Sequence, residues 1–268
     1  MIREPSQPKA GENLRSTTAN RPPGTLFIVG TPIGSPRDIT LRAVDILKQV
    51  AVVAAETPLV TQTFLARHGI GTTITSYGPR NYQEKIALLL RKISDGHDVA
   101  LVSDSGMPVI YDPGRLLIAA AHKAKLPVSV IPGPSALTAA IALSGYLGNR
   151  LVFEGSLPHR RPQLQRLLAS FEFESRPVVL FLHPGSLRSV MQSIARTLPA
   201  RTVTVAADLT TPHEIIYQGK PAGLVRKLVS LRKEAEVTLV LRGTVKRRRS
   251  GKTAKRRRVE GSSRRDGG

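Results

Sequence analysis

The sequence predicts an α/β protein made of two α/β domains and a disordered basic C-terminal tail. Three observations lead to this class. Short β-branched runs alternate with segments of helical periodicity, as in a parallel sheet with flanking helices. The runs of the first half are continuously apolar, as in strands that helices bury on both faces. In the second half, no helical segment separates the run at 202–207 from the run at 213–219, which predicts a mixed sheet there.

The first domain is expected to contain five strands and five helices, separated by loops rich in glycine and proline. Asp38 stands where its carboxylate would cap the first helix. The expected strands are residues 25–30, 51–55, 72–76, 98–103 and 127–131. The expected helices are residues 38–48, 59–67, 81–94, 114–123 and 135–143.

The second domain is expected to follow the stretch SGYLGNR, which has the composition of a linker. Its expected strands are residues 151–155, 177–182, 202–207, 213–219 and 236–243, and its expected helices are residues 162–171, 186–197 and 221–233. The predicted division is a flexible arm (1–23), an N-terminal domain (24–143), a linker (144–150), a C-terminal domain (151–243) and the tail (244–268).

Composition excludes several classes of protein. The 268 residues are 41% hydrophobic but include no Trp and no Cys, so the core is aliphatic, and disulfides and thiolate metal sites are excluded. No apolar run reaches the roughly 18 residues that span a bilayer, and the N-terminal segment lacks the apolar stretch of a signal peptide. We therefore expect a cytoplasmic protein with no membrane partner. No His, Asp and Glu residues have metal-ligand spacing.

The formal net charge of +21 is unevenly distributed. Residues 246–268 hold 11 Lys or Arg against only Glu260 and Asp266. A run of this kind predicts a disordered segment that either keeps the protein soluble or contacts phosphates. Because the part before the tail is also basic, the charge favours a nucleic-acid partner.

Three loops follow predicted strands of the first domain: GTPIGSPRD (30–38), SDSGMPVIYDPGR (103–115) and IPGPSA (131–136). Ligands of open α/β sheets bind beyond the carboxyl ends of the strands, where such loops lie. Glycine lets the backbone approach a ligand, and proline fixes the loop in advance. None of the three loops has the Walker or the Rossmann pattern, so neither ATP nor NAD is indicated.

Further residues around these loops form a recognisable series. In the first half they are Thr31–Gly34, Asp38–Ala43, Ala54–Glu56, Ser76–Tyr77, Ala100–Asp104 with Gly106 and Pro108, Asp112–Gly114 and Pro132–Ala136. In the second half they are Phe153–Gly155, Leu157–Pro158, Leu209–Thr210 and His213–Glu214. In order and spacing, over about residues 24–243, the chain resembles the tetrapyrrole-methylase fold family, the class III S-adenosylmethionine methyltransferases.

The resemblance implies S-adenosyl-L-methionine as cofactor, in a cleft between the two domains. The members most similar to this chain methylate the ribose 2′-hydroxyl of a cytidine in 16S rRNA, so ribosomal RNA of the small subunit is the implied partner and a homodimer the implied assembly. The implied cofactor-binding residues are Pro32, Gly34, Ser103, Asp104, Gly106, Pro108, Pro132, Gly133, Pro134, Ser135, Phe153 and Ala207.

The chain departs from the family mainly at charged positions. Thr57-Pro58-Leu59 stand where the family has Asp-Thr-Arg, Gly78-Pro79 replace His-Glu, and Leu182–Ser186 replace a Glu-Ser-Pro-His-Arg stretch. These changes indicate either a retained cofactor site with an altered substrate side, or drift around an unchanged reaction. Two other functions stay open: a non-catalytic or retuned RNA-binding paralogue and a tetrapyrrole methylase.

Methylation of a ribose hydroxyl calls for a group that accepts its proton or that stabilises the oxyanion as it forms. The candidate catalytic residues are Glu56, which follows a buried strand, and Asp104, which ends another. A contact to the cofactor explains Asp104 equally well. Asp112 is equally a candidate helix cap, and His213 is expected to begin a strand.

Several basic residues are candidates for binding RNA phosphates: Arg37, Arg42, Arg80, Arg160, Arg161, Lys246, Arg247, Arg248 and Arg249. The stretch LPHRRPQ (157–163) is the densest cluster of the folded part, and the solvated start of a helix explains it equally well. His183, beside Pro184, is expected in a surface turn.

Overall fold

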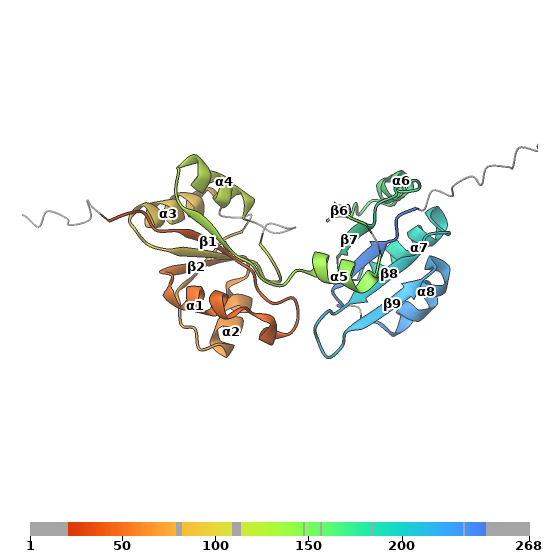
Figure 1. The fold of residues 1–268 in the computed structure, drawn as a ribbon, viewed down its shortest axis with the longest axis horizontal. Coiled ribbons are helices and arrows are strands. Elements are labelled where there is room, and N and C mark those ends of the chain that lie inside the picture. The colour runs from red at the N-terminus through yellow and green to blue at the C-terminus, as the bar shows by residue number, and fades with distance from the viewer. Residues whose placement is uncertain are drawn as a thin grey trace, which may run out of the picture.

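The computed structural model describes residues 21–78, 82–108, 114–146, 148–155, 157–183, 185–232 and 234–244. Two five-stranded sheets lie side by side, each covered by helices (Figure 1). The strand orders are β3-β2-β4-β1-β5 and β6-β7-β10-β8-β9. The first sheet is entirely parallel and the second is mixed, which confirms the predicted fold class. The predicted tail from residue 245 lies outside the described residues.

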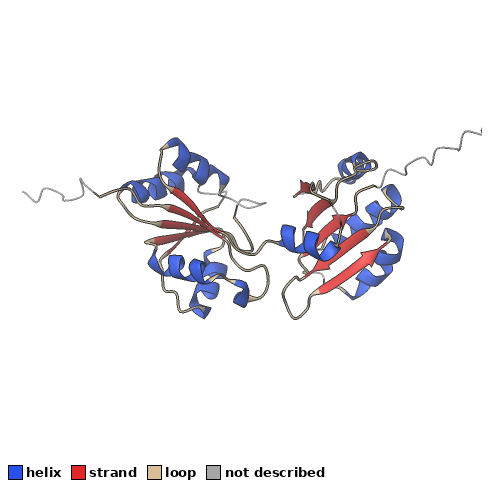
Figure 2. Ribbon diagram, in the orientation of Figure 1, coloured by secondary structure: helices blue, strands red, loops and turns tan. Residues whose placement is uncertain are grey.

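The first sheet has helices on both faces (Figure 2). Its strands are β1 (Leu26–Val29), β2 (Val52–Ala55), β3 (Ile74–Ser76), β4 (Val99–Val102) and β5 (Val128–Ile131). Its helices are α1 (Leu41–Gln49), α2 (Pro58–Arg67), α3 (Tyr82–Ser94) and α4 (Arg115–Lys123). Alternate strand residues pack under α1 and α2 on one face and under α3 and α4 on the other, which explains why β1, β2 and β4 are apolar throughout.

The first helix begins later than the sequence predicts, and Asp38 does not cap it. Pro36 opens a separate 3₁₀ turn, Pro36–Asp38, so α1 starts only at Leu41. Thr40 is the N-cap, and its hydroxyl oxygen accepts a hydrogen bond of 3.1 Å from the amide of Ala43.

The second sheet is covered by helices from its own domain and by one helix that the sequence placed in the first domain. Its strands are β6 (Val152–Glu154), β7 (Val178–Leu182), β8 (Val203–Ala207), β9 (Ile215–Gly219) and β10 (Val237–Leu241). One face is covered by α6 (Arg161–Ser170), α7 (Leu187–Thr197) and α8 (Pro221–Lys227), which ends in the 3₁₀ turn Leu228–Ser230. The other face is covered by α5 (Ala136–Ser144), which packs on β8 and β10 (Figure 1). The helix expected at the end of the first domain thus packs on the second sheet.

Arg201, at 7% exposure, is a buried cation of the second sheet. Its guanidinium donates hydrogen bonds to the backbone carbonyls of Phe171, Glu172, Glu174 and Arg242. It joins the end of α6 to the end of β10, because these carbonyls belong to the segments that follow the two elements.

Replacing Arg201 with methionine should lower the free energy of unfolding by about 1–3 kcal/mol, because methionine leaves buried carbonyls without donors. Urea denaturation measures the decrease. The exposed Arg196→Met is the matched control and should stay within about 0.5 kcal/mol of the parent. Equal stability of the two variants would contradict a structural role for Arg201.

Within the part of the chain that the structure describes, every helix is too short or too polar to serve as a transmembrane span.

Candidate functional site

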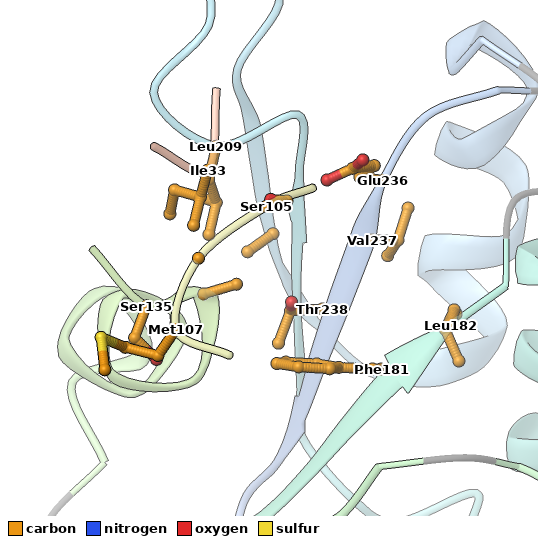
Figure 3. A pocket seen from close by; sticks show the side chains of 13 residues that line it. Ile33, Ser105, Met107, Ser135, Phe181, Leu182, Leu209, Glu236, Val237 and Thr238 are labelled. Carbon is orange, nitrogen blue, oxygen red and sulfur yellow. The ribbon is translucent and has the colours of Figure 1, made fainter. Parts of the chain in front are cut away.

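A pocket of about 230 Å³ lies between the loops of the first sheet and one face of the second; we call it the intersheet pocket (Figure 3). It is lined by Ile33, Ser105, Gly106, Met107, Ser135, Ala136, Phe181, Leu182, Ala206, Leu209, Glu236, Val237 and Thr238. The first-sheet residues come from the loops after β1, β4 and β5. These strands are neighbours and parallel, so their carboxyl ends open at one edge, where ligands of such sheets bind.

Hydrogen bonds hold two of these loops together. The amide of Thr31 donates to the carbonyl of Gly106 at 2.9 Å, and its hydroxyl lies 3.2 Å from the carbonyls of both Ser103 and Gly106. Gly106 has a φ of +76°, a conformation that side chains disfavour. The wall formed by Ser105–Met107 therefore presents its backbone in a fixed position.

Gly30 and Gly133 bring the loops after β1 and β5 into direct contact. A Cβ atom added at Gly133 would lie 2.9 Å from the Cα of Gly30, closer than real Cβ atoms come. Neither Gly30 nor Gly133 lines the intersheet pocket or the pocket beside α2. A side chain at Gly133 would therefore disturb the backbone of the site.

Gly34 closes the space between the first-sheet loops and the second sheet. A Cβ atom added there would lie 2.2 Å from the carbonyl oxygen of Leu209. Beside it, the amide of Ser35 donates to the hydroxyl of Thr210 at 2.9 Å. The Thr31–Gly34 loop thus contacts the β8–β9 connection directly.

Glu236 adds a carboxylate to the wall that the second sheet provides. Its amide donates to the carboxylate of Asp208 at 3.1 Å, and Arg232 forms an ion pair of 2.9 Å with the same carboxylate. Burial, with the charge of Asp208 as the second cause, raises the pKa of Glu236 above its ordinary value. No sequence motif pointed to Glu236, Phe181 or Thr238, because each lies in or beside a strand of the sheet core.

A second pocket of about 450 Å³, the α2 pocket, lies on the other side of the Thr31–Gly34 loop. It is lined by Thr31, Pro32, Gly34, Pro36, Leu59, Val60, Thr61, Thr63, Phe64, Arg67, Ser103 and Asp104. Leu59 is 72% exposed although apolar. Leu59, in the Thr57–Leu59 segment that stands where the family has Asp-Thr-Arg, thus gives this pocket an apolar wall.

The structure brings Glu56 close to Asp104; Asp104 lines the α2 pocket, and Glu56 is not among its lining residues. The carboxylate of Asp104 accepts a hydrogen bond of 3.1 Å from the amide of Thr57. Burial of the Glu56 side chain, and next the negative charge of Asp104, raise the pKa of Glu56 above its ordinary value. A carboxylate whose pKa is raised towards neutrality is better matched to accept a proton.

The residues expected to bind a cofactor fall into three groups. Gly106 and Ser135 line the intersheet pocket, whereas Pro32, Gly34, Ser103 and Asp104 line the α2 pocket. The others line neither pocket: Pro108, Pro132, Gly133, Pro134, Phe153 and Ala207.

The positions of Phe153 and Ala207 explain why these two residues line neither pocket. The ring of Phe153 packs against that of Phe181, with centroids 4.9 Å apart, and Phe181 faces the pocket. The side chain of Ala207 lies in the core on the opposite face of the second sheet, while Ala206 lines the pocket. The side chain of Ala207 therefore does not face this pocket, because neighbours on a strand point to opposite faces.

Those basic residues expected to bind RNA that the structure describes line neither pocket. Arg42 donates a hydrogen bond of 2.8 Å to the carbonyl of Val130, at the edge strand β5. Arg37, Arg160 and Arg161 are exposed, the last two at the start of α6. Arg80, Asp112 and Lys246–Arg249 lie outside the described residues. His213 precedes β9 by two residues and lies in an exposed turn.

Comparison with known proteins gives a consistent result. A family model described as Tetrapyrrole (Corrin/Porphyrin) Methylases matches residues 25–224. The Thermotoga maritima protein named Ribosomal RNA small subunit methyltransferase I is 38% identical over 220 residues, which cover 82% of this chain and 99% of that protein. The Escherichia coli O157:H7 protein of the same name is 34% identical over 230 residues, covering 84% and 80%.

Solved structures share the fold at lower identity. The X-ray structure of a cobalamin biosynthetic enzyme, cobalt precorrin-4 methyltransferase, superimposes with a TM-score of 0.62 at 19% identity, covering 81% of this chain and 94% of that one. A likeness at this identity establishes the fold alone.

Proposed function

The chain belongs to the tetrapyrrole methylase family, and from this premise we propose that it transfers a methyl group from S-adenosylmethionine to ribosomal RNA of the small subunit. One observation carries the proposal: the intersheet pocket lies between the three strand-end loops and the second sheet. The relatives of this chain are named Ribosomal RNA small subunit methyltransferase I. We further propose that the product is a 2′-O-methylcytidine, and that the chain acts as a cytoplasmic homodimer, as the family resemblance implies.

The lining of the intersheet pocket suits this cofactor. Ile33, Met107 and Phe181 offer the apolar surface that an adenine ring requires. Ser105, Ser135, Thr238 and Glu236 offer hydrogen-bonding groups for ribose hydroxyls and for the amino acid part. When bound, S-adenosylmethionine supplies an electrophilic methyl group on a positively charged sulfur.

The α2 pocket suits the acceptor. We assign Pro32, Gly34, Ser103 and Asp104 to the RNA side. The ribose hydroxyl is placed where Asp104 of this pocket adjoins Ser105 of the intersheet pocket, because the attacking oxygen must come within about 3–3.5 Å of the methyl carbon. Glu56 accepts the proton of the hydroxyl as it attacks the methyl carbon. Asp104 positions the turn after β2 through the amide of Thr57, and it keeps the pKa of Glu56 raised.

Transfer of radioactive label tests the proposal. The purified chain is incubated with S-adenosylmethionine that carries a labelled methyl group and with small ribosomal subunits that lack the modification. We expect label in the rRNA and, after digestion to nucleosides, in 2′-O-methylcytidine. Cofactor binding without label in RNA would favour a non-catalytic or retuned RNA-binding paralogue. Label that appears only in an added tetrapyrrole would favour a tetrapyrrole methylase.

The basic tail gives a separate prediction. Deleting residues 246–268 removes 11 Lys or Arg and two acidic residues. If the tail binds phosphates, the log–log salt dependence of RNA binding should flatten by about 0.7 for each phosphate that the shortened chain no longer neutralises. Filter binding between about 50 and 200 mM salt measures the slope. Deleting residues 1–20, which hold three cationic and two acidic residues, is the control. An unchanged slope without the tail would reduce it to a solubilising segment.

A further inference from the structure

A third pocket, of about 170 Å³, lies at the carboxyl ends of the parallel strands β6 and β7; we call it the histidine pocket. It is lined by Leu157, Pro158, His159, Leu164, Phe181, His183, Ser186, Ser189 and Val190. Neither the cofactor site nor the proton transfer at Glu56 uses the two histidines. The pocket includes part of the Leu182–Ser186 stretch, where this chain departs from the family, so the resemblance implies no role for it.

The pocket combines an apolar floor with aromatic sides. Leu164 and Val190 are buried beneath it. The exposed rings of His159 and His183 stand at its rim, with centroids 6.4 Å apart and planes at 73°. Flat, weakly polar rings over an apolar floor favour a small flat ligand, and nucleobases stack on such side chains.

The two serines of the pocket restrict the chemistry of the ligand. The hydroxyl of Ser186 donates to the carbonyl of His183 at 2.6 Å, and that of Ser189 donates to the carbonyl of Ser186 at 2.8 Å. A serine hydroxyl has one proton and two lone pairs. Because both protons are used by the backbone, the two hydroxyls can only accept from a ligand. An exocyclic amino group carries two N–H donors, one for each hydroxyl, whereas uracil has only the single N–H of its ring.

The charge around the pocket is positive. Arg160 and Arg161 follow His159 at the start of α6, and Arg188 lies in the first turn of α7; all three are exposed. No acidic side chain is among the lining residues that the structure describes. These guanidinium groups suit the phosphates that flank a bound base.

We propose that the histidine pocket binds an unpaired, amino-bearing nucleobase of the RNA substrate. The proposal rests on the proposed function, since it concerns the same RNA. Phe181 lines both the histidine pocket and the intersheet pocket, so the two pockets are neighbours along β7. The pocket thereby selects the RNA segment that carries the target ribose.

A binding experiment tests the pocket without any methyl transfer. Cytidine 5′-monophosphate and uridine 5′-monophosphate are titrated into the full chain while the imidazole resonances of its six histidines are followed. His159→Ala and His183→Ala assign the two signals. We expect saturable shifts at both with the cytidine nucleotide and at least several-fold weaker binding of the uridine nucleotide. Equal shifts by the two nucleotides, or shifts at neither histidine, would overturn the proposal.

Kinetics with the RNA substrate separate this proposal from the proposed function. His183→Ala should raise the KM for RNA by about tenfold, since the variant has no ring for the base to stack on. Ser189→Ala should raise it several-fold, since alanine offers no acceptor. The dissociation constant for S-adenosylmethionine should not change. His122→Ala, an exposed histidine of α4, is the matched control.

The two failures are distinguishable. If the unaltered chain methylates no RNA, the proposed function is wrong, whatever the nucleotides show. If it methylates RNA while both variants keep the KM within twofold of the parent, the proposed function stands and the base-binding pocket is refuted.

Discussion

Replacing Glu56 with glutamine is expected to slow methyl transfer to RNA by about 10²–10⁴-fold, because an amide cannot accept the ribose proton. Single-turnover transfer of labelled methyl measures the rate. The affinity for S-adenosylmethionine should stay unchanged, since Glu56 does not line the intersheet pocket. Glu84→Gln, an exposed glutamate in the first turn of α3, is the matched control and should keep the parent rate.

The pH dependence of the rate should follow the raised pKa of Glu56. Only the deprotonated carboxylate accepts a proton, so the rate falls as the pH drops through that pKa, which lies above the ordinary 4.5. Asp104→Asn removes the negative charge beside Glu56 and lowers this pKa, so the acid limb should move to lower pH. A limb that stays in place in Asp104→Asn, or a parent rate in Glu56→Gln, would exclude Glu56 as the base.

Replacing Ser135 with phenylalanine should weaken S-adenosylmethionine binding by about 100-fold or more, because the ring would occupy a pocket of about 230 Å³. Ser135 is the N-cap of α5, but its side chain makes no capping hydrogen bond there. Removing its hydroxyl should therefore leave the helix intact. Isothermal calorimetry measures the affinity, and circular dichroism checks the fold.

Thr138→Phe is the matched control for this substitution. Thr138 lies one turn further along α5, and its side chain is exposed. It should bind the cofactor as the parent does. Comparable affinity in Ser135→Phe and Thr138→Phe would show that the cofactor lies elsewhere. This pair is a sharper test than a substitution at Gly133, where any side chain meets the backbone of Gly30.

The loops of the site could be predicted because they follow from local patterns and one rule of sheet geometry. Continuous apolar runs marked β1, β4 and β5, and glycine and proline marked the loops after them. Parallel strands bring such loops to one edge. Which side chains face the pocket could not be predicted, as Ala206 and Ala207 show: the apolar pattern of β8 is the same on both faces.

Contacts between side chains that lie far apart in the sequence could not be predicted either. His159 and His183 each looked like a surface residue, and they meet only because β6 and β7 pair in parallel. Glu236 looked like the start of a strand, and it reaches the intersheet pocket because β10 lies at the centre of the second sheet.

The sequence by itself determined the order of strands and helices, the class of each sheet and the three strand-end loops, because these depend on residues close together in the chain. Only the tertiary structure decided that α5 packs on the second sheet, that the Thr31–Gly34 loop separates two pockets, and that Glu56 lies beside Asp104. These features depend on strand order and on the direction of each side chain. Both are settled by packing between distant segments, which local periodicity does not encode.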